Sequence, residues 1–213
     1  MRNENENENV IPKEFKVILL GNSGVGKTNL INTSVGLAFQ ELHECTINNT
    51  YMEKRIKIDE EQYILNLWDT AGQEAYKSVT KIFIKGAKIV IFVYDITKAQ
   101  SFNDLDEWMK ICKELNEQDY TCGIVGNKSD LFLNEEVEEQ KAKDYAEEKK
   151  IPFRLVSAKE DPKSFETFLI ELVSLHIKNN DDDDLEKRKT FELRDIDNKI
   201  HKKKKKKCFG LFG

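Results

Sequence analysis

A glycine-rich segment near the start of the chain has the residue types that a phosphate site needs. Gly21–Thr28 fits the pattern G-x-x-x-x-G-K-[ST] and follows the apolar run Phe15–Leu20. Glycines let the backbone turn tightly, so that successive N–H groups point at phosphate oxygens, and the helix that begins there adds the positive end of its dipole. We expect Lys27 to reach the β- and γ-phosphates and Thr28 to give its hydroxyl to Mg²⁺. The pattern predicts a nucleotide site and leaves ATP and GTP open.

A second polar segment, Asn127–Asp130, indicates which base is bound. It follows the apolar run Cys122–Gly126. The carboxylate of Asp130 can accept hydrogen bonds from the N1–H and the 2-amino group of guanine together, whereas adenine offers neither donor there. An acceptor left unpaired lowers affinity by orders of magnitude. The segment therefore predicts guanine, with an ordinary surface turn as the alternative.

A third segment, Trp68–Glu74, supplies groups for a metal ion and for hydrolysis. Asp69 is a carboxylate at a strand end, placed to hold Mg²⁺ through a water. The backbone N–H of Gly72 can meet a γ-phosphate, and Gln73 can orient the attacking water. These residue types predict slow hydrolysis of GTP to GDP, with a polar turn as the alternative.

The elements that would position these groups alternate along the chain. Strand-like runs cover residues 15–20, 50–58, 63–68, 89–94, 122–126 and 153–156, and helical patterns start at Lys27 and cover Leu105–Leu115, Glu135–Lys150 and Phe165–His176. Alternation of this kind predicts an α/β fold with a mostly parallel six-stranded sheet and helices on both faces. The site is then expected at the carboxyl ends of the strands.

Composition changes mark the ends of the folded part. We expect a disordered N-terminal tail over residues 1–13, a GTPase domain over residues 14–178 and a hypervariable C-terminal tail over residues 179–213. The last tail contains six lysines, Lys202–Lys207, followed by Cys208. The lysines suit an anionic membrane surface, and one lipid on Cys208 would supply the second signal for anchoring. A solvated basic tail or a nuclear-type signal remains the alternative.

The overall composition excludes other classes of function. The chain has 39% hydrophobic and 34% charged residues and a net charge of −5, which suits a soluble globular protein and gives no support for a nucleic-acid partner. Its four cysteines lack zinc-ligand spacing. We expect reduced thiols in the cytosol, with Cys112 and Cys122 in the core.

The three segments, together with Ser157–Lys159, occur in an order and spacing that resembles a small GTPase of the Ras superfamily. The resemblance covers about residues 14–178 and implies the P-loop NTPase (small G-protein) fold. Phe15–Gly21, Val93–Thr97 and Ser101-Phe102 resemble the Rab branch in particular.

The resemblance implies further site residues. Phe39 would lie against the guanine, Thr46 would bind Mg²⁺ and the γ-phosphate, and Phe39–Thr46 and Ala71–Thr80 would be the two switches. The Ala158 N–H would contact guanine. The implied catalytic residues are Gln73, Lys27 and Gly72, and the implied metal ligands are Thr28, Thr46 and Asp69. The implied nucleotide-binding residues are Gly21, Ser23, Gly24, Val25, Gly26, Lys27, Thr28, Asn29, Phe39, Thr46, Asp69, Gly72, Asn127, Lys128, Asp130, Ser157, Ala158 and Lys159.

The resemblance also implies partners and a place of action. Tyr51, Trp68 and Phe83 are candidates for effector contacts, with partial burial as the alternative. An exchange factor is expected. A GTPase-activating protein is expected as well, because Phe39–Thr46 contains no arginine that could stabilise the transition state in cis. The expected role is a switch in vesicle trafficking, peripheral on the cytosolic face of an endomembrane.

Three departures from the Rab pattern leave the subfamily open. Asn48 stands where the first switch usually has glycine, Ala75 where the second usually has arginine, and Cys208 is a single cysteine where Rabs usually carry a pair. Two other functions remain: a nucleotide-dependent scaffold with little hydrolysis, against which Gln73 argues, and an ATP-using enzyme, against which Asn127 and Asp130 argue.

Overall fold

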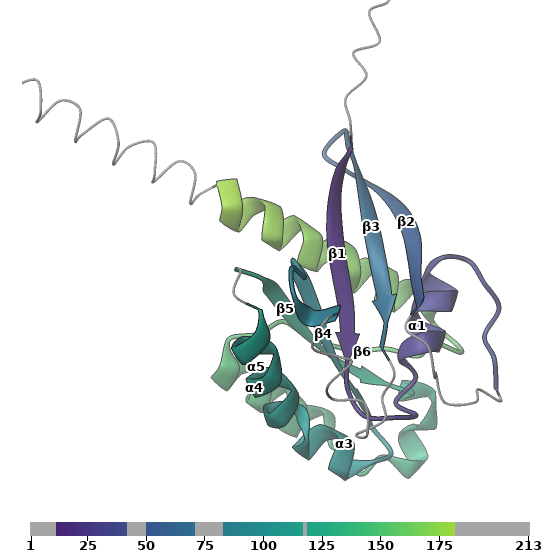
Figure 1. Ribbon diagram of the computed structural model, residues 1–213. Helices are drawn as coiled ribbons and strands as arrows, with labels where there is room; N and C mark the ends of the chain where they lie inside the picture. Colours follow the sequence, from purple (N-terminus) through teal and green to yellow (C-terminus); the bar gives the residue numbers. More distant parts are fainter. Residues whose placement is uncertain (1–11, 42–49, 71–82, 117–118, 182–213) are drawn as a thin grey trace, which may run out of the picture. The chain divides into compact units, whose positions relative to one another are not determined.

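A computed structural model describes the chain over residues 12–41, 50–70, 83–116 and 119–181 (Figure 1). The chain divides into two compact units, Met1–Ser174 and Leu175–Gly213. The first unit contains the sheet and every candidate site residue that the structure describes. Thr46, Gly72, Gln73, Lys202–Lys207 and Cys208 lie outside the described residues.

The centre of the first unit is a six-stranded sheet with the strand order β2-β3-β1-β4-β5-β6. Neighbouring strands pair in parallel except for β2, which is antiparallel to β3. The expected α/β architecture with a mostly parallel six-stranded sheet is confirmed. The strands are β1 (Lys13–Leu20), β2 (Thr50–Ile58), β3 (Glu61–Asp69), β4 (Ile89–Asp95), β5 (Thr121–Asn127) and β6 (Phe153–Leu155).

The burial of each strand follows from its place in the sheet. All seven residues of β4 are buried, as expected for a central strand covered on both faces. The hairpin between β2 and β3 turns at Asp59 and Glu60, whose φ angles are 46° and 69°. The turn falls between the strand-like runs at residues 50–58 and 63–68 of the sequence.

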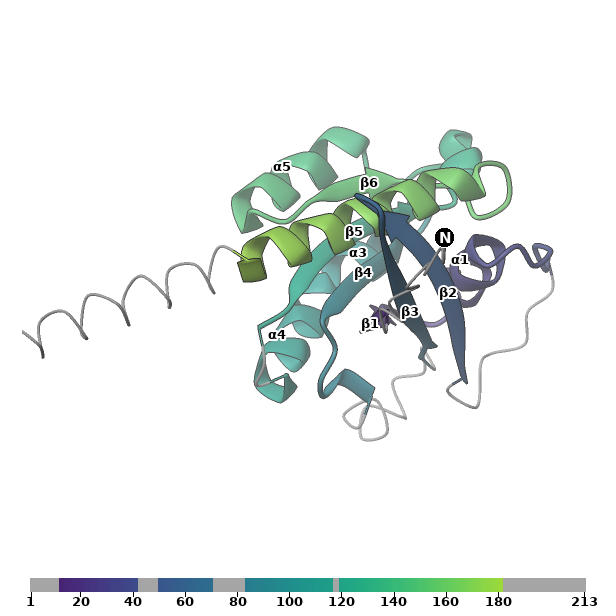
Figure 2. The ribbon, with the colours of Figure 1, turned by 90° about the horizontal axis from the view of Figure 1, so that it is seen from above.

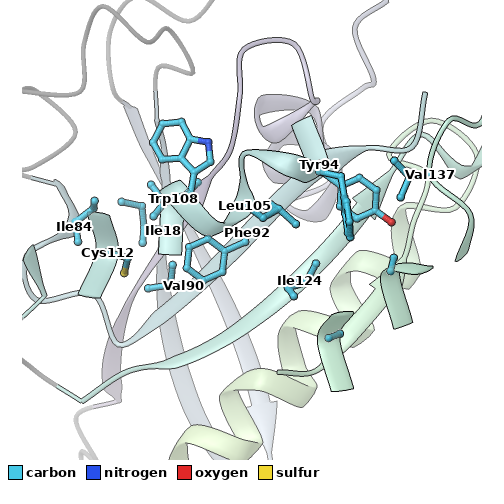
Figure 3. Close-up of a cluster of buried hydrophobic side chains, with 14 of the residues drawn as sticks. Ile18, Ile84, Val90, Phe92, Tyr94, Leu105, Trp108, Cys112, Ile124 and Val137 are labelled. Atoms are coloured by element: carbon cyan, nitrogen blue, oxygen red, sulfur yellow. The ribbon is translucent and has the colours of Figure 1, made fainter. Parts of the chain in front are cut away.

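Helices cover both faces of the sheet. On one face, side chains of β1, β4 and β5 pack against α3 (Ala99–Asn103), α4 (Leu105–Leu115) and α5 (Glu139–Lys149). Figure 3 shows this cluster, which includes Phe92, Trp108 and Cys112. On the other face, a Cβ on Gly123 of β5 would come within 2.8 Å of Phe168 and 2.7 Å of Leu172, so the helix that begins at residue 162 packs closely there.

The first helix lies near strands β2 and β3. α1 (Lys27–Ser34) contacts β3 and lies on the side of β2 and β3 in both views (Figures 1 and 2). It begins directly after the glycine-rich loop that follows β1. The carboxyl end of β1 and the amino end of α1 therefore meet at one edge of the sheet, as the sequence predicts.

One helix starts later than expected. The charged pattern predicts a helix from Glu135, but α5 begins at Glu139. The backbone N–H groups of Glu136 and Val137 both donate to the carbonyl of Ile96, and Val137 is buried, so this stretch is held against the end of β4. Before it, a 3₁₀ helix, η2 (Ser129–Asn134), follows β5. Neither η2 nor the short α3 is apparent from the periodicity.

Among the described residues, no helix is both long enough and apolar enough to cross a membrane. Cys112 and Cys122 are free thiols; Cys112 is buried and Cys122 is partly buried. The prediction that these two cysteines pack in or against the core is confirmed.

Candidate functional site

The loop between β1 and α1 has a backbone that only glycine permits at two positions. Gly21 has a φ of 150°, and a Cβ there would lie 2.1 Å from the carbonyl oxygen of Val93. Gly26 has a φ of 97°, and a Cβ there would lie 2.3 Å from Nδ2 of Asn127. The loop is therefore pressed against the ends of β4 and β5, and its conformation is fixed by contacts that leave no room for a side chain.

Lys27 is the first residue of α1, and its side chain folds back over this loop. It is 5% exposed, and its Nζ donates hydrogen bonds to the carbonyl oxygens of Gly21 (2.8 Å) and Asn22 (2.9 Å). The loop thus holds one positive charge beside the amino end of a helix. Both features favour an anion such as a phosphate.

Thr28 and Asp69 bring a hydroxyl and a carboxylate together from different elements. The Thr28 Oγ1 donates a hydrogen bond of 2.7 Å to Oδ2 of Asp69. Asp69 is the last residue of β3 and is 3% exposed. Oxygen donors of these two kinds fit Mg²⁺, which prefers carboxylate and hydroxyl oxygens. The third expected ligand, Thr46, lies outside the described residues.

Asn127, the last residue of β5, joins two loops. It is 2% exposed. Its Nδ2 donates to the carbonyl oxygen of Val25 (2.8 Å), and its Oδ1 accepts from the N–H of Ala158 (3.2 Å). The loop after β1, the end of β5 and the loop after β6 are therefore held as one structure by a single amide side chain.

Asp130 is oriented by the loop after β6. Its Oδ1 accepts a hydrogen bond of 2.6 Å from the Ser157 hydroxyl, whose oxygen in turn accepts from the N–H of Glu160 (2.9 Å). Its other oxygen, Oδ2, has no hydrogen bond to the rest of the described chain. A carboxylate fixed in this way keeps acceptor capacity for a ligand that presents adjacent N–H donors.

Lys128 contacts the end of β4. Its Nζ lies 2.6 Å from Oδ2 of Asp95, and Asp95 is fully buried. The backbone of Lys128 has a φ of 67°, a conformation that turns the chain sharply after β5. Asp95 was not singled out from the sequence, although a carboxylate at the carboxyl end of a strand is a signal that could have identified it.

Phe39, Glu41 and Lys159 form a contact between segments far apart in the sequence. The Lys159 Nζ donates a hydrogen bond of 2.9 Å to Oε1 of Glu41 and lies 6.0 Å from the centre of the Phe39 ring. This bond lowers the pKa of Glu41 and raises the pKa of Lys159 from their ordinary values. Phe39 thus lies near Lys159, in the loop that carries Ala158, and its contact with guanine stays a prediction.

Asn29 has a role that the sequence did not indicate. Its Nδ2 donates to the carbonyl oxygen of Gln40 (2.9 Å), and its Oδ1 accepts from the N–H of Gln40 (3.1 Å). The pair of bonds attaches the segment that carries Phe39 to α1. Because the two residues lie eleven positions apart and Gln40 uses only its backbone, no residue pattern reveals the contact.

A second unexpected contact connects the loop after β1 to α4. The Trp108 Nε1 donates to Oδ1 of Asn22 (2.9 Å), and Trp108 is 4% exposed in α4. In the sequence, the helical spacing of Leu105–Leu115 puts Leu105, Met109, Cys112 and Leu115 on one side, and it does not indicate that Trp108 is buried. A tryptophan that needs a partner for its N–H is the signal that could have identified it.

Tyr51, Trp68 and Phe83 form a separate contact. The rings of Tyr51 and Trp68 stack at 5.1 Å, and those of Trp68 and Phe83 lie 5.3 Å apart. Tyr51 is 58% exposed, while Trp68 and Phe83 are partly buried against the core. The three aromatic residues therefore form one cluster with an exposed end.

Comparison with known proteins gives a consistent result. The model of the Ras family matches residues 16–176 of this chain. The chain is 39% identical over 145 residues to the Ras-related protein Rab-2B of Dictyostelium discoideum, which covers 68% of this chain and 72% of that protein. It is 38% identical over 164 residues to the Ras-related protein Rab-11C of the same organism, which covers 76% of this chain and 73% of that protein.

Proposed function

The chain belongs to the Ras family, in its Rab branch, and we propose that the loops after β1, β3, β5 and β6 form its nucleotide pocket. As a small GTPase it binds GTP and GDP with Mg²⁺ and hydrolyses GTP, and it acts with exchange factors, activating proteins and effectors. The observation that carries the proposal is the Asn127 side chain, which bonds both Val25 and Ala158. Through these two hydrogen bonds, Asn127 connects the loop after β1, which would bind the phosphates, to the loop after β6, which would lie beside the base. We therefore assign both loops to one pocket.

In this proposal, Gly21–Asn29 bind the phosphates. The N–H groups of Ser23, Gly24, Val25 and Gly26 face the α- and β-phosphate oxygens, and Lys27 exchanges its bonds to the loop carbonyls for bonds to the β- and γ-phosphates. The carbonyl contacts already hold the Lys27 ammonium over the loop, so little rearrangement is needed.

Guanine is read by Asp130. With Oδ1 engaged by Ser157, the carboxylate plane is fixed, and the carboxylate accepts from the N1–H and the 2-amino group of the base. The Ala158 N–H, which is shared with Asn127, lies at the same edge. Phe39 and Lys159 flank the base on its open side.

Thr28 and Asp69 hold the metal, with Thr46 as the further ligand. Mg²⁺ neutralises charge on the β- and γ-phosphates when it is bound. The hydrogen bond of 2.7 Å between the two side chains supports this assignment, in which Asp69 would contact the ion through a water.

Hydrolysis proceeds by attack of a water on the γ-phosphorus, in line with the bond to the β-phosphate oxygen, which breaks to leave GDP. Gln73 orients the water, and Gly72 and Thr46 bind the γ-phosphate, so that its loss releases both switch segments. Because residues 39–46 contain no arginine, the chain depends on a partner for that charge, a contribution of roughly 10³–10⁵ in rate.

The role we propose is a switch in vesicle trafficking on the cytosolic face of an endomembrane. Lys202–Lys207 would attract anionic lipids and Cys208 would carry one lipid chain. Mass spectrometry of the C-terminal peptide from the cells that make the protein tests the lipid; an unmodified Cys208 in the membrane fraction contradicts this part.

Competition binding tests the pocket. The purified chain is loaded with fluorescent GDP, and unlabelled GDP, GTP and ATP are titrated against it. We expect GDP and GTP to displace the probe at least about 10³-fold better than ATP, and Asp130→Asn to lose most of that preference. Asp144→Asn is the matched control, because Asp144 is an exposed residue of α5. Displacement by ATP at a concentration similar to that of GDP would refute the base assignment.

A further inference from the structure

Three consecutive apolar side chains stand exposed directly after Asp130. Leu131 is 43% exposed, Phe132 63% and Leu133 86%. They are the third to fifth residues of η2, and we refer to Leu131–Leu133 as the apolar tip. Single exposed apolar residues are ordinary on protein surfaces, whereas a consecutive run marks a place where something binds.

The backbone on both sides holds the apolar tip outward. On the amino side, Asp130 is bonded to Ser157, and the Leu131 N–H donates to the carbonyl of Lys128 (2.9 Å). On the carboxyl side, the Glu136 N–H donates to the carbonyl of Ile96 (2.8 Å), and Val137 is 1% exposed in the core. These contacts fix the backbone on both sides of the apolar tip.

The residues that follow the apolar tip in the chain are acidic. Four glutamates follow it within six residues, and all four are exposed: Glu135, Glu136, Glu138 and Glu139. Glu136 accepts a hydrogen bond from the Ala99 N–H, and Glu139 pairs with Lys143 at 2.6 Å. Over the part of the chain that the structure describes, Glu135 and Glu138 make no ion pair. The surface is thus apolar at its tip and negative at its margin.

This charge pattern decides what can cover the apolar tip. A second copy that used the same surface would bring the glutamates of both copies together, which is unfavourable. An anionic lipid surface would be repelled in the same way. A protein whose own surface is positive would be attracted by the margin while the tip loses its contact with water.

We infer that the apolar tip inserts into an apolar pocket of a partner protein whose rim carries lysine or arginine. Leu133 and Phe132 fill the pocket, and Glu135 and Glu138 face the basic rim. The tip differs from the Tyr51–Trp68–Phe83 cluster in its elements and in its charge, so it provides a second, separate contact. The inference does not depend on whether GTP or GDP occupies the nucleotide pocket of this chain.

The test begins with a photo-reactive amino acid at position 133 of the full chain, expressed in the cells that make the protein. The same probe at Leu37, which is 52% exposed, is the position control. The cross-linked peptide is sequenced and the captured protein is purified. A cross-link specific to position 133 is expected; its absence, or a cross-link to a second copy of this chain, overturns the inference.

A cross-linked protein supports the inference only if its binding, measured with the purified protein, depends on the apolar tip. In calorimetric titrations, Leu133→Asp is expected to weaken binding at least tenfold, whereas Leu37→Asp leaves it within about twofold. Glu135→Lys is expected to weaken binding and to flatten its dependence on salt. Because Leu133 is 86% exposed, Leu133→Asp should keep the wild-type melting temperature and GDP affinity, which separates a lost contact from a lost fold.

Two results contradict the inference at this stage. One is equal binding by wild type and Leu133→Asp. The other is a cross-linked surface on the partner without apolar residues and without lysine or arginine near them. A membrane is the remaining candidate to cover the apolar tip. Sedimentation of the purified chain with vesicles that contain phosphatidylserine tests it. Vesicle binding that is lost in Leu133→Asp would show that the tip contacts a membrane instead of a protein.

Discussion

The amide of Asn127 uses its donor and its acceptor on two different loops. Val25 O and Ala158 N are both backbone atoms, and Asn127 itself is almost fully buried. A buried backbone group that loses its partner carries the full cost of its desolvation, about 1–3 kcal/mol. Asn127 therefore affects the pocket mainly by shaping it.

Asn127→Ala should leave both backbone groups without partners. We expect the free energy of unfolding to fall by about 1–3 kcal/mol and GDP release to accelerate about tenfold or more. Urea unfolding and release of fluorescent GDP measure the two effects. Asn66→Ala is the control, because the Asn66 amide only reaches the exposed Glu14 carboxylate. Wild-type release rates in Asn127→Ala would show that the connection through Asn127 is dispensable.

Glu41→Gln removes the charge that holds Lys159 near Phe39. The pair is exposed, so its contribution is small and is screened by salt. We expect GDP release to accelerate by less than about threefold at low salt and to match wild type near 1 M salt. Glu61→Gln, which disrupts the exposed Lys13–Glu61 pair, should change nothing. An effect that persists at high salt would mean that Glu41 has another partner.

The sequence singles out candidate site residues where the chemistry is contained in neighbouring positions. Lys27, Thr28 and Asp130 could be placed because each stands in a short segment whose residues act together. The bonds between Asn22 and Trp108 and between Glu41 and Lys159 could not, because they join positions 86 and 118 residues apart. Such contacts depend on how helices pack on the sheet, and no local spacing records that.

At the scale of elements, strands were easier to predict than helix ends. β2 and α4 have the predicted bounds. α5 starts four residues late, because the backbone is extended at Glu135 and Glu138 (ψ of 133° and 138°), on either side of the two N–H groups that bond to Ile96. Helix propensity is overruled there by a tertiary hydrogen bond.

Two glycines of similar backbone conformation offer a matched pair at the scale of elements. Gly26 and Gly36 have φ angles of 97° and 87°, but a Cβ at Gly26 would meet Asn127, whereas one at Gly36 meets nothing within 4 Å. We expect Gly36→Ala to lower the free energy of unfolding by about 1 kcal/mol with unchanged GDP affinity. Gly26→Ala should lose more stability and at least about tenfold in GDP affinity. Equal GDP affinity in the two variants would contradict the close packing of this loop on β5.

At the scale of the whole molecule, the core contains two thiols that resist ionisation. Burial raises the pKa of Cys112 to about 11 and the pKa of Cys122 to about 11. In the unfolded chain both would ionise from about pH 8.5. Their stabilising effect is therefore complete below that pH and is lost as the pH rises to about 11.

Urea unfolding between pH 8 and pH 11 checks this behaviour. Wild type should lose free energy of unfolding through this window, at up to about 1.4 kcal/mol per pH unit for each thiol. The double variant Cys112→Ala/Cys122→Ala should start less stable and show a shallower slope, since the other titrating groups are common to both proteins. Parallel slopes would show that these thiols are not protected by the core.

The two hydrogen bonds of the Asn127 side chain also determine when, during synthesis of the chain, the pocket can be complete. The phosphate loop is made early, but the side chain that braces it and the backbone group that completes the pocket belong to residues 127 and 158. At ordinary rates of translation, the ribosome adds the intervening residues over on the order of ten seconds. During that time the emerging chain has the loop for the phosphates without the loop for the base. Nucleotide can therefore first stabilise the fold through the complete pocket only after residue 158 has been made.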